Sequence, residues 1–322
     1  MNNFIYENRT KVYFGQGCVK EFLACLVRDA GNIMLAYGQG SVKRNGIYDE
    51  VLNILMKEGK HVTEFPGIMP NPTYQKVMEG ARLAREEKTE MILGVIVTTA
   101  GTGSECNGAA VITNEEQKVK TGHDYPKCNP AFALMDPAYT FSVPGGQMVS
   151  GAFDSLSHMM EAYFSEPDEQ NVSDEISEAL MRSVIKNIRQ AVRDPKDYTV
   201  RSNLLWSSAM SENRLIKQGK RCDFACHLME HQLSAYTGCS HSQGMSVLQP
   251  VYYRHIYRDG LDKFARFARN VWMIPEEGRN REELAEAGVH DLADLIRETG
   301  LPARLREIGI KGQGQLKEIA DS

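Results

Sequence analysis

The sequence predicts two parts, a doubly wound (Rossmann-like) α/β domain over residues 1–143 and an all-helical domain over residues 144–322. In the first hundred residues, short apolar runs alternate with amphipathic stretches, the pattern of β-α-β units that feed a parallel sheet. From about Pro144 onward, apolar residues recur at intervals of three and four, and strand-like runs are nearly absent. A chain of 322 residues with 42% hydrophobic residues is long enough for two cores.

The expected elements of the first domain are three strands and the helices that join them. NIMLAYG (32–38), HVTEF (61–65) and MILGVIVTT (91–99) are the strand candidates, because each is a short apolar run rich in strand-forming residues. Amphipathic stretches at 42–59 and 73–88 are the intervening helices. In the second domain, helical periodicity covers 146–164, 172–192, 199–216 and 222–236.

Charge and composition exclude several classes of partner. The formal net charge is −5, and acidic and basic residues are interspersed, so no basic stripe is present to bind nucleic acid. No apolar run approaches the ~20 residues of a membrane-spanning helix, and the N-terminus has no signal-peptide pattern. The seven cysteines form no C-x-x-C pair and are expected to be reduced thiols. We therefore expect a cytoplasmic protein that binds neither nucleic acid nor membranes.

Two clusters of side chains suggest a metal site in the helical domain. Asp154 and His158 are four residues apart on a predicted helix, which places both side chains on one face. His227, His231 and His241 lie within fifteen residues of one another. These five are more than a catalytic divalent ion needs, because such sites take three or four protein ligands. Spacing alone leaves open whether His227 or His231 is the spare one.

Longer motifs connect these residues to a known family. The stretches YGQGSVKRNG, GTGSE, FALMDPAYT, GAFDSLSHMMEAYF and HLMEHQLSAYTGCSHSQGMSVLQP resemble the iron-containing alcohol dehydrogenases, particularly their NADPH-dependent butanol dehydrogenase and aldehyde reductase branch. In that family, two later histidines fourteen residues apart complete the metal site. The resemblance thus implies that Asp154, His158, His227 and His241 bind Fe(II) or Zn(II). It also implies that His231 is a non-ligand histidine that relays a proton.

The same resemblance assigns cofactor contacts in the first domain. Gly38, Gly40 and Ser41 lie at the end of the strand predicted at 32–38, where a doubly wound fold binds a dinucleotide, and the resemblance makes them contacts for its adenosine end. The turn contains no acidic residue, and Ser41, Lys43 and Arg44 can bind a 2′-phosphate, which favours NADP(H) over NAD(H). Further implied contacts are Asn71, Thr98, Thr102 and Lys120.

One family motif is absent. Members carry G-G-G-S-x-x-D-x-x-K on the strand and loop that hold the cofactor pyrophosphate, whereas here Leu93 and Gly94 lead directly into Val95. Parallel neighbouring strands need a crossover of about a dozen residues or more, so a segment is missing near 94–95. Two interpretations remain: a true deletion, or further residues of the protein at this point. The intact metal ligands and GTGSE favour the second.

The predicted function is metal-dependent hydride transfer between NADP(H) and a small or medium aliphatic alcohol or aldehyde. An iron-type alcohol dehydrogenase acting as a homodimer is the resulting expectation, with dimerisation through a first strand such as TKVYFG. Three alternatives remain. One is a glycerol-dehydrogenase-like or dehydroquinate-synthase-like enzyme of the same fold. The second is a metallohydrolase, and the third is a non-catalytic metal-binding protein.

Overall fold

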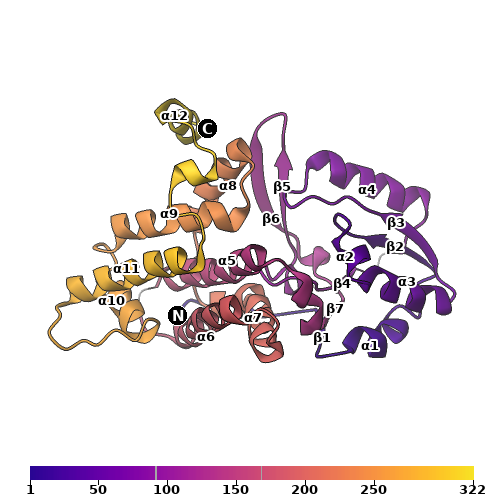
Figure 1. Ribbon diagram of the computed structural model, residues 1–322, viewed down its shortest axis with the longest axis horizontal. Helices are drawn as coiled ribbons and strands as arrows, with labels where there is room; N and C mark the ends of the chain where they lie inside the picture. The colour runs from indigo at the N-terminus through magenta and orange to yellow at the C-terminus, as the bar shows by residue number, and fades with distance from the viewer. Residues whose placement is uncertain (91–92, 168) are drawn as a thin grey trace. The chain divides into compact units, whose positions relative to one another are not determined.

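The computed structural model describes residues 1–90, 93–167 and 169–322, and these form two compact units (Figure 1). The α/β unit comprises residues 9–98 and 105–142, and the helical unit comprises residues 1–8, 99–104 and 143–322. The sequence had placed the first eight residues and 99–104 in the first domain. They belong to the helical unit, where Asn2 N–H donates to Gly219 O (3.0 Å) and Gly101 N–H donates to Ser208 Oγ (2.7 Å).

The strands of the α/β unit form three small sheets. β1 (Lys11–Phe14), β7 (Phe132–Met135) and β4 (Gly94–Ile96) are parallel in the order β1-β7-β4, and β2 (Asn32–Ala36) pairs in parallel with β3 (His61–Phe65). The third strand candidate, 91–99, is therefore strand only at Gly94–Ile96, and its first two residues lie outside the described part of the chain. An antiparallel hairpin of β5 (Ala109–Asn114) and β6 (Val119–Asp124) was not predicted.

Helices cover the parallel strands of this unit. α1 (Cys18–Leu26) follows β1, the single-turn α2 (Ser41–Arg44) and α3 (Ile47–Lys57) follow β2, and α4 (Tyr74–Glu86) follows β3. All four residues of β7 are buried, and apolar residues of α1 and α3 such as Leu23 and Leu55 belong to the same core cluster. Short 3-10 turns occupy Ser104–Cys106, Pro126–Cys128 and Pro137–Ser142.

The helical unit confirms the predicted helical character of the C-terminal half. The four predicted helices correspond to α5 (Gly145–Tyr163), α6 (Val172–Arg193), α7 (Tyr198–Glu212) and α8 (Ala225–Thr237). They are followed by α9 (His241–Ile256), α10 (Leu261–Asn270), α11 (Arg281–Thr299) and α12 (Gln313–Ala320), with 3-10 turns at Leu215–Lys217 and Leu305–Ile308. None of the described helices combines the length and apolar character needed to cross a membrane.

α5 is the central helix of this unit. It packs against α6, α7 and α9, and buried residues occupy most of its length. A helix that is buried nearly all round can carry polar groups only where they are satisfied by partners. The polar side chains of α5 that bear on a functional site are those of Asp154, His158 and Glu161.

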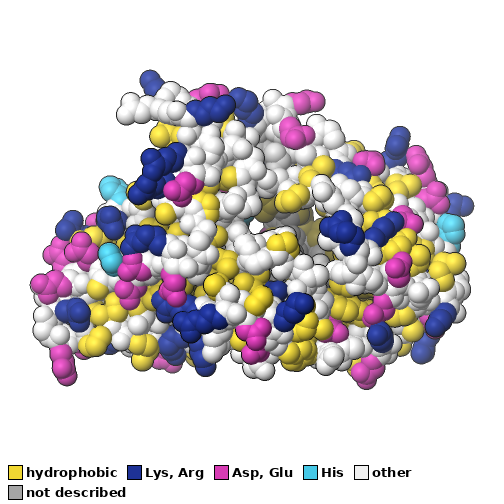
Figure 2. Space-filling model, in the orientation of Figure 1, with side chains coloured by type: hydrophobic (Ala, Val, Ile, Leu, Met, Phe, Trp, Pro, Cys, Tyr) yellow, Lys and Arg dark blue, Asp and Glu magenta, His cyan; other side chains and the backbone are white. Residues whose placement is uncertain are grey.

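Charged side chains are mixed on the surface. Figure 2 shows Lys and Arg interspersed with Asp and Glu on the face displayed, as the net charge of −5 and the sequence pattern predict. That face carries no stripe of one sign that would suit a phosphate backbone.

Candidate metal centre

Two of the predicted ligands come from one face of α5. Asp154 and His158 are separated by one helical turn, and the ring Nδ1 of His158 lies 2.9 Å from the main-chain oxygen of Asp154. A carbonyl oxygen can only accept, so Nδ1 carries the proton in this contact. The lone pair of His158 is then on Nε2, the nitrogen available to a cation.

The other two predicted ligands lie at the starts of neighbouring helices. His227 is the third residue of α8, and His241 is the first residue of α9, where Ser240 and Gln243 form a capping box. The helix starts there because Ser240 and Gln243 satisfy the N-terminal N–H groups.

These four side chains converge. One ligand atom from each of Asp154, His158, His227 and His241 lies within 4.8 Å of the others. The ring centroids of His158 and His227 are 4.5 Å apart, and those of His227 and His241 are 5.0 Å apart. Imidazoles this close to a carboxylate match the geometry of a small cation site.

The donor set fits a divalent metal. Asp154 Oδ1 and His227 Nε2 are buried and form no hydrogen bond with any described residue, although Asp154 Oδ1 lies 3.5 Å from His241 Nε2. Unsatisfied buried polar atoms are costly, and one cation would satisfy both. Burial, followed by the nearby His158 and His241, lowers the pKa of His227 well below its usual value. The ring is therefore held in the neutral form that binds a metal.

Two glutamates behind the site were missed by sequence reasoning. Glu161 accepts the N–H groups of Cys226 (2.7 Å) and His227 (3.1 Å) and contacts His227 Nδ1. Glu230 contacts His241 Nδ1 in the same way. Carboxylates that bind the second nitrogen of a ligand histidine fix its tautomer and orientation. A glutamate three residues after His158, in an otherwise apolar run, was the signal available in the sequence.

Burial and backbone donors act in opposite directions on Glu161. Burial raises its pKa to about 7, while the N–H groups of Cys226 and His227 oppose that shift. Glu230 is fully buried, and a Cβ at Gly244 would lie 2.7 Å from its Oε1. Glycine at position 244 therefore lets α9 approach Glu230 closely enough for the His241 contact.

His231 lies one turn after His227 on α8. It is 9% exposed, and its ring centroid is 5.7 Å from that of His241. A second possible ligand group, Glu230, His231 and His241, shares His241 with the first. Because Glu230 already contacts His241 Nδ1, the four-residue group offers the more complete cation site.

The predicted cofactor contacts are divided between the units. Gly38 and Gly40 form the turn after β2, Ser41 begins α2, and Asn71 lies just before α4. Thr98 follows β4 and lines a pocket with residues of β2 and α3, and Lys120 is buried in β6. Thr102 lies in the helical unit, where its hydroxyl contacts Ser104 Oγ at 2.8 Å.

An acidic side chain lies beside the glycine turn, although none lies within it. Glu64 of β3 forms an ion pair with Lys43 (Nζ to Oε2, 3.2 Å) and accepts a hydrogen bond from the hydroxyl of Tyr37. The hydrogen bonds from Tyr37, Tyr48 and Lys43 lower the pKa of Glu64 to about 2. Lys43, a residue expected to bind a 2′-phosphate, is thus engaged by a carboxylate from the neighbouring strand.

The fold and the site define a metalloenzyme with an α/β unit and a helical metal-binding unit, and comparisons with known proteins identify its family. The model for the C-terminal part of the Fe-containing alcohol dehydrogenase family matches residues 148–322. The iron-containing alcohol dehydrogenase model matches residues 9–95 and 93–137. The chain belongs to the iron-containing alcohol dehydrogenase family. It is an oxidoreductase, a metal-dependent alcohol dehydrogenase or aldehyde reductase.

Similar proteins extend over nearly the whole chain. NADH-dependent butanol dehydrogenase A of Clostridium acetobutylicum is 32% identical over 361 positions, covering 99% of this chain and 92% of that protein. NADPH-dependent aldehyde reductase YqhD of Escherichia coli is 28% identical and covers 97% and 90%. The crystal structure of an NADH-dependent butanol dehydrogenase A from Thermotoga maritima has a TM-score of 0.94 at 31% identity, covering 100% and 90%.

The family implies a nicotinamide cofactor, and the α/β unit fits it only in part. The turn Gly38–Ser41 is suited to an adenosine end. The described residues of that unit offer no comparable place for the pyrophosphate, and the family model matches in two pieces that meet at residues 93–95.

Proposed function

We propose that the protein reduces small or medium aliphatic aldehydes to primary alcohols and catalyses the reverse oxidation. The observation that carries this proposal is the convergence of Asp154, His158, His227 and His241 on one point. The substrate class is supported by relatives named as butanol dehydrogenases and an aldehyde reductase. Of the alternatives, the metallohydrolase and the non-catalytic metal-binding protein have no support from the family match.

We assign the four converging residues as ligands of Fe(II) or Zn(II), which three imidazoles and one carboxylate accept alike. When bound, the ion supplies Lewis-acid polarisation of the alcohol or carbonyl oxygen. Asp154 contributes a negative charge that partly balances the ion. Glu161 and Glu230 hold His227 and His241 in the orientation that directs their Nε2 atoms inward.

His231 is the proposed proton relay. Its position next to His241 places an imidazole near the metal ligands without making it one of the four. Imidazoles titrate near neutral pH, which suits exchange of the alcohol proton with solvent. In the proposed cycle, a ring nitrogen of His231 takes this proton during oxidation and returns it during reduction.

For the nicotinamide cofactor we propose NADP(H) in preference to NAD(H), with Gly38, Gly40, Ser41, Asn71, Thr98, Thr102 and Lys120 as contacts. Ser41 and Arg44 support this choice, because hydroxyl and guanidinium groups bind a 2′-phosphate. The ion pair between Lys43 and Glu64 weakens it. Relatives named for NADH and for NADPH are both present, so each cofactor must be tested.

We further propose a homodimer located in the cytoplasm. β1 is an outer strand of its sheet, and an outer strand can pair with a second copy. None of the seven cysteines, all of which lie in the described part of the chain, forms a disulfide, as expected in a reducing compartment.

The test is an assay at 340 nm with butanal and either NADPH or NADH, each up to millimolar concentration. We expect aldehyde-dependent cofactor oxidation with the metal-loaded protein and none after treatment with a chelator. Glycerol as the preferred alcohol substrate would favour the glycerol-dehydrogenase-like alternative. Loss of the signal with every aldehyde, at full metal occupancy, would contradict the proposed function.

A further inference from the structure

The parallel strands of the α/β unit are divided into two groups. β2 pairs with β3 alone, and β4 pairs with β7 alone, so no described strand joins β2 to β4. The first four residues of β2 are only partly buried and Ala36 is exposed, while β4 begins with an exposed Gly94. Strands inside a parallel sheet are normally covered on both faces, as β7 is. β2 and β4 instead have the exposure of edge strands.

The two groups of strands are joined by a very short interval of sequence. Glu90 N–H donates to Asn32 O at the start of β2 (3.1 Å), and Leu93 O accepts from Ala131 N–H before β7 (2.7 Å). The described contact to β2 at position 90 and the contact beside β7 at position 93 are thus separated by only two residues of sequence. A parallel crossover takes about a dozen residues or more, so no strand, loop and helix can be accommodated there.

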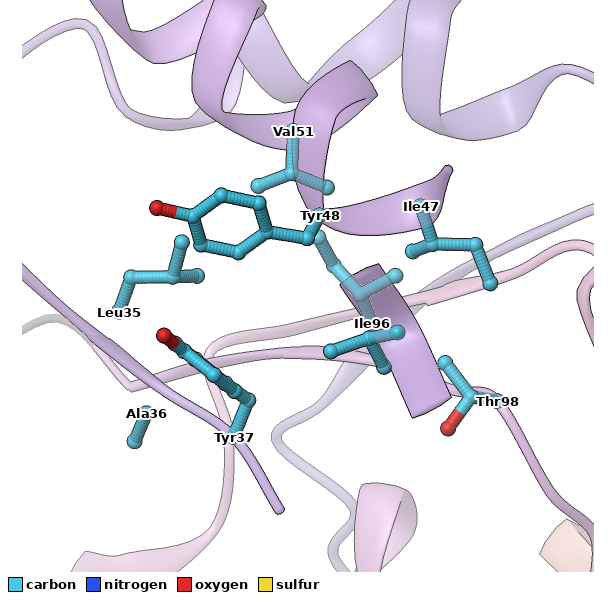
Figure 3. Close-up of a pocket in the computed structure, with 9 residues that line it drawn as sticks. Leu35, Ala36, Tyr37, Ile47, Tyr48, Val51, Ile96 and Thr98 are labelled. Carbon is cyan, nitrogen blue, oxygen red and sulfur yellow. The ribbon is translucent and has the colours of Figure 1, made fainter. Parts of the chain in front are cut away.

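A pocket lies between β2 and β4. It is lined by Leu35, Ala36 and Tyr37 on one side and by Ile96 and Thr98 on the other, with Tyr48 and Val51 of α3 over it (Figure 3). Its cavity volume is about 80 Å³, enough for a few water molecules but far below the volume of a dinucleotide. Most of its lining is aliphatic or aromatic, and such a surface favours contact with apolar groups and disfavours the burial of charged phosphates.

The helix N-termini of this unit are not available to a pyrophosphate. At α1, the Gly17 N–H donates to the buried carboxylate of Asp136 (2.7 Å), whose negative charge disfavours a phosphate. α3 carries Asp49 and Glu50 in its first turn, and α4 is capped by Thr73, whose hydroxyl accepts Lys76 N–H. α2 has a single turn, and β4 leads into no helix within its unit.

We propose, in place of the interpretation that the sequence favoured, that the deletion near residue 94 belongs to this protein and that the α/β unit therefore binds NAD(P)H without a binding site for its pyrophosphate. Phosphate groups are held by charge-assisted hydrogen bonds, which are the stronger ones in a dinucleotide site. Without these hydrogen bonds, NADPH is expected to bind little more tightly than reduced nicotinamide mononucleotide, which lacks the adenosine half. Only the kinetic part of this inference rests on the proposed function.

The first measurements use the unmodified protein. Peptide mapping by mass spectrometry is expected to find Leu93 joined directly to Gly94 within one peptide, and additional residues between these two positions would overturn the inference. Calorimetric titration of the metal-loaded protein with NADPH is expected to show no saturation below roughly millimolar concentration, the range of weak fragment-like binding. A micromolar dissociation constant for NADPH would overturn it.

The kinetic measurement compares two hydride donors with butanal as the substrate. We expect kcat/KM for NADPH to exceed that for reduced nicotinamide mononucleotide by no more than about tenfold, since linked groups gain affinity only when both are bound at once. A ratio of about a hundredfold or more would contradict the inference. If neither donor is oxidised, the proposed function fails, and the NADPH titration still decides the question of binding.

A graft provides the gain-of-function test. The segment of a butanol dehydrogenase relative that carries G-G-G-S-x-x-D-x-x-K and its helix is inserted between Leu93 and Gly94. We expect NADPH to bind at least about tenfold more tightly, because glycine-rich loops and helix N-termini hold phosphates. The matched control is the same insertion with its three glycines replaced by alanine. This control should restore the crossover between the strands without raising the affinity for NADPH. Equal affinity in the graft and its control would contradict the role assigned to the missing loop.

Discussion

The carboxylate of Glu161 holds His227 at two points, accepting its backbone N–H at 3.1 Å and contacting its ring Nδ1. The first contact fixes the start of α8, and the second fixes the ring. Position and orientation of the ligand are therefore set by one side chain from α5.

Replacing Glu161 by glutamine should weaken metal binding. The amide keeps the size of the side chain but loses the charge that orients and polarises His227, and such changes typically cost about 10- to 100-fold in metal affinity. A competition titration with a chromogenic chelator measures the effect. Glu286→Gln, at an exposed position of α11, is the matched control and should bind metal as the unmodified protein does. Equal affinities for the two variants would show that Glu161 does not position the ligand.

His231→Asn should separate proton transfer from metal binding. We expect kcat for alcohol oxidation to fall by about 100-fold or more, within the usual range for loss of a general base, while metal content stays unchanged. The informative readout is the dependence of kcat on pH, because the variant should lose the change in kcat that occurs near neutral pH. A variant with the unmodified pH profile would rule out the relay.

Gly151→Ala should loosen the segment 99–104 from α5. A Cβ at position 151 would lie 2.0 Å from Ala100 O, a separation that the backbone must relieve by moving. Overpacking of this kind costs about 1–3 kcal/mol, which urea denaturation can measure. Gly145→Ala on the same helix has no atom within 4 Å of the added Cβ and serves as the control. Equal losses of stability in both variants would contradict the close packing at Gly151.

The buried Glu105 should make the α/β unit less stable as the pH rises. Its Oε1 has no hydrogen-bond partner among the described residues, and burial raises its pKa to about 7 from the ordinary 4.5. Because the pKa is higher in the folded state, the protonated Glu105 contributes its full stabilisation below pH 4.5, and this contribution is lost as the pH rises through 7. Glu105→Gln should remove that dependence, leaving the variant more stable at pH 8 by up to about 3 kcal/mol.

The exposed Glu116→Gln in the turn between β5 and β6 is the control for this experiment. Urea midpoints from pH 4.5 to 8 are compared for the three proteins. A parallel pH dependence in the unmodified protein and the Glu105 variant would show that another group is responsible.

Local patterns account for what the sequence predicted well. The helices α5 to α8 follow from a periodicity of 3.6 residues, and the pairing of Asp154 with His158 follows from their spacing on one helix. The sequence spacing left His227 and His231 as equal candidates, because both lie on α8 one turn apart. The family resemblance implied His227, and the tertiary arrangement places His227, and not His231, in the group with Asp154.

The missed features depend on contacts between distant residues. Glu161 meets His227 across 66 positions, and Glu230 reaches His241 from another helix. Glu64 engages Lys43 from a neighbouring strand, which changes the expected environment of the glycine turn. The hairpin β5-β6 was also missed, because its second strand VKTGHD has little apolar alternation and five of its six residues are exposed.

The central claim is that one divalent ion binds to Asp154, His158, His227 and His241. The direct measurement strips the purified protein with a chelator, reconstitutes it with Fe(II) or Zn(II), and determines bound metal by elemental analysis. We expect one ion per chain in the unmodified protein and in a variant with the exposed His255 replaced by alanine. The double variant His227→Ala, His241→Ala should retain almost none. A full ion in the double variant, or none in the unmodified protein, would contradict the account.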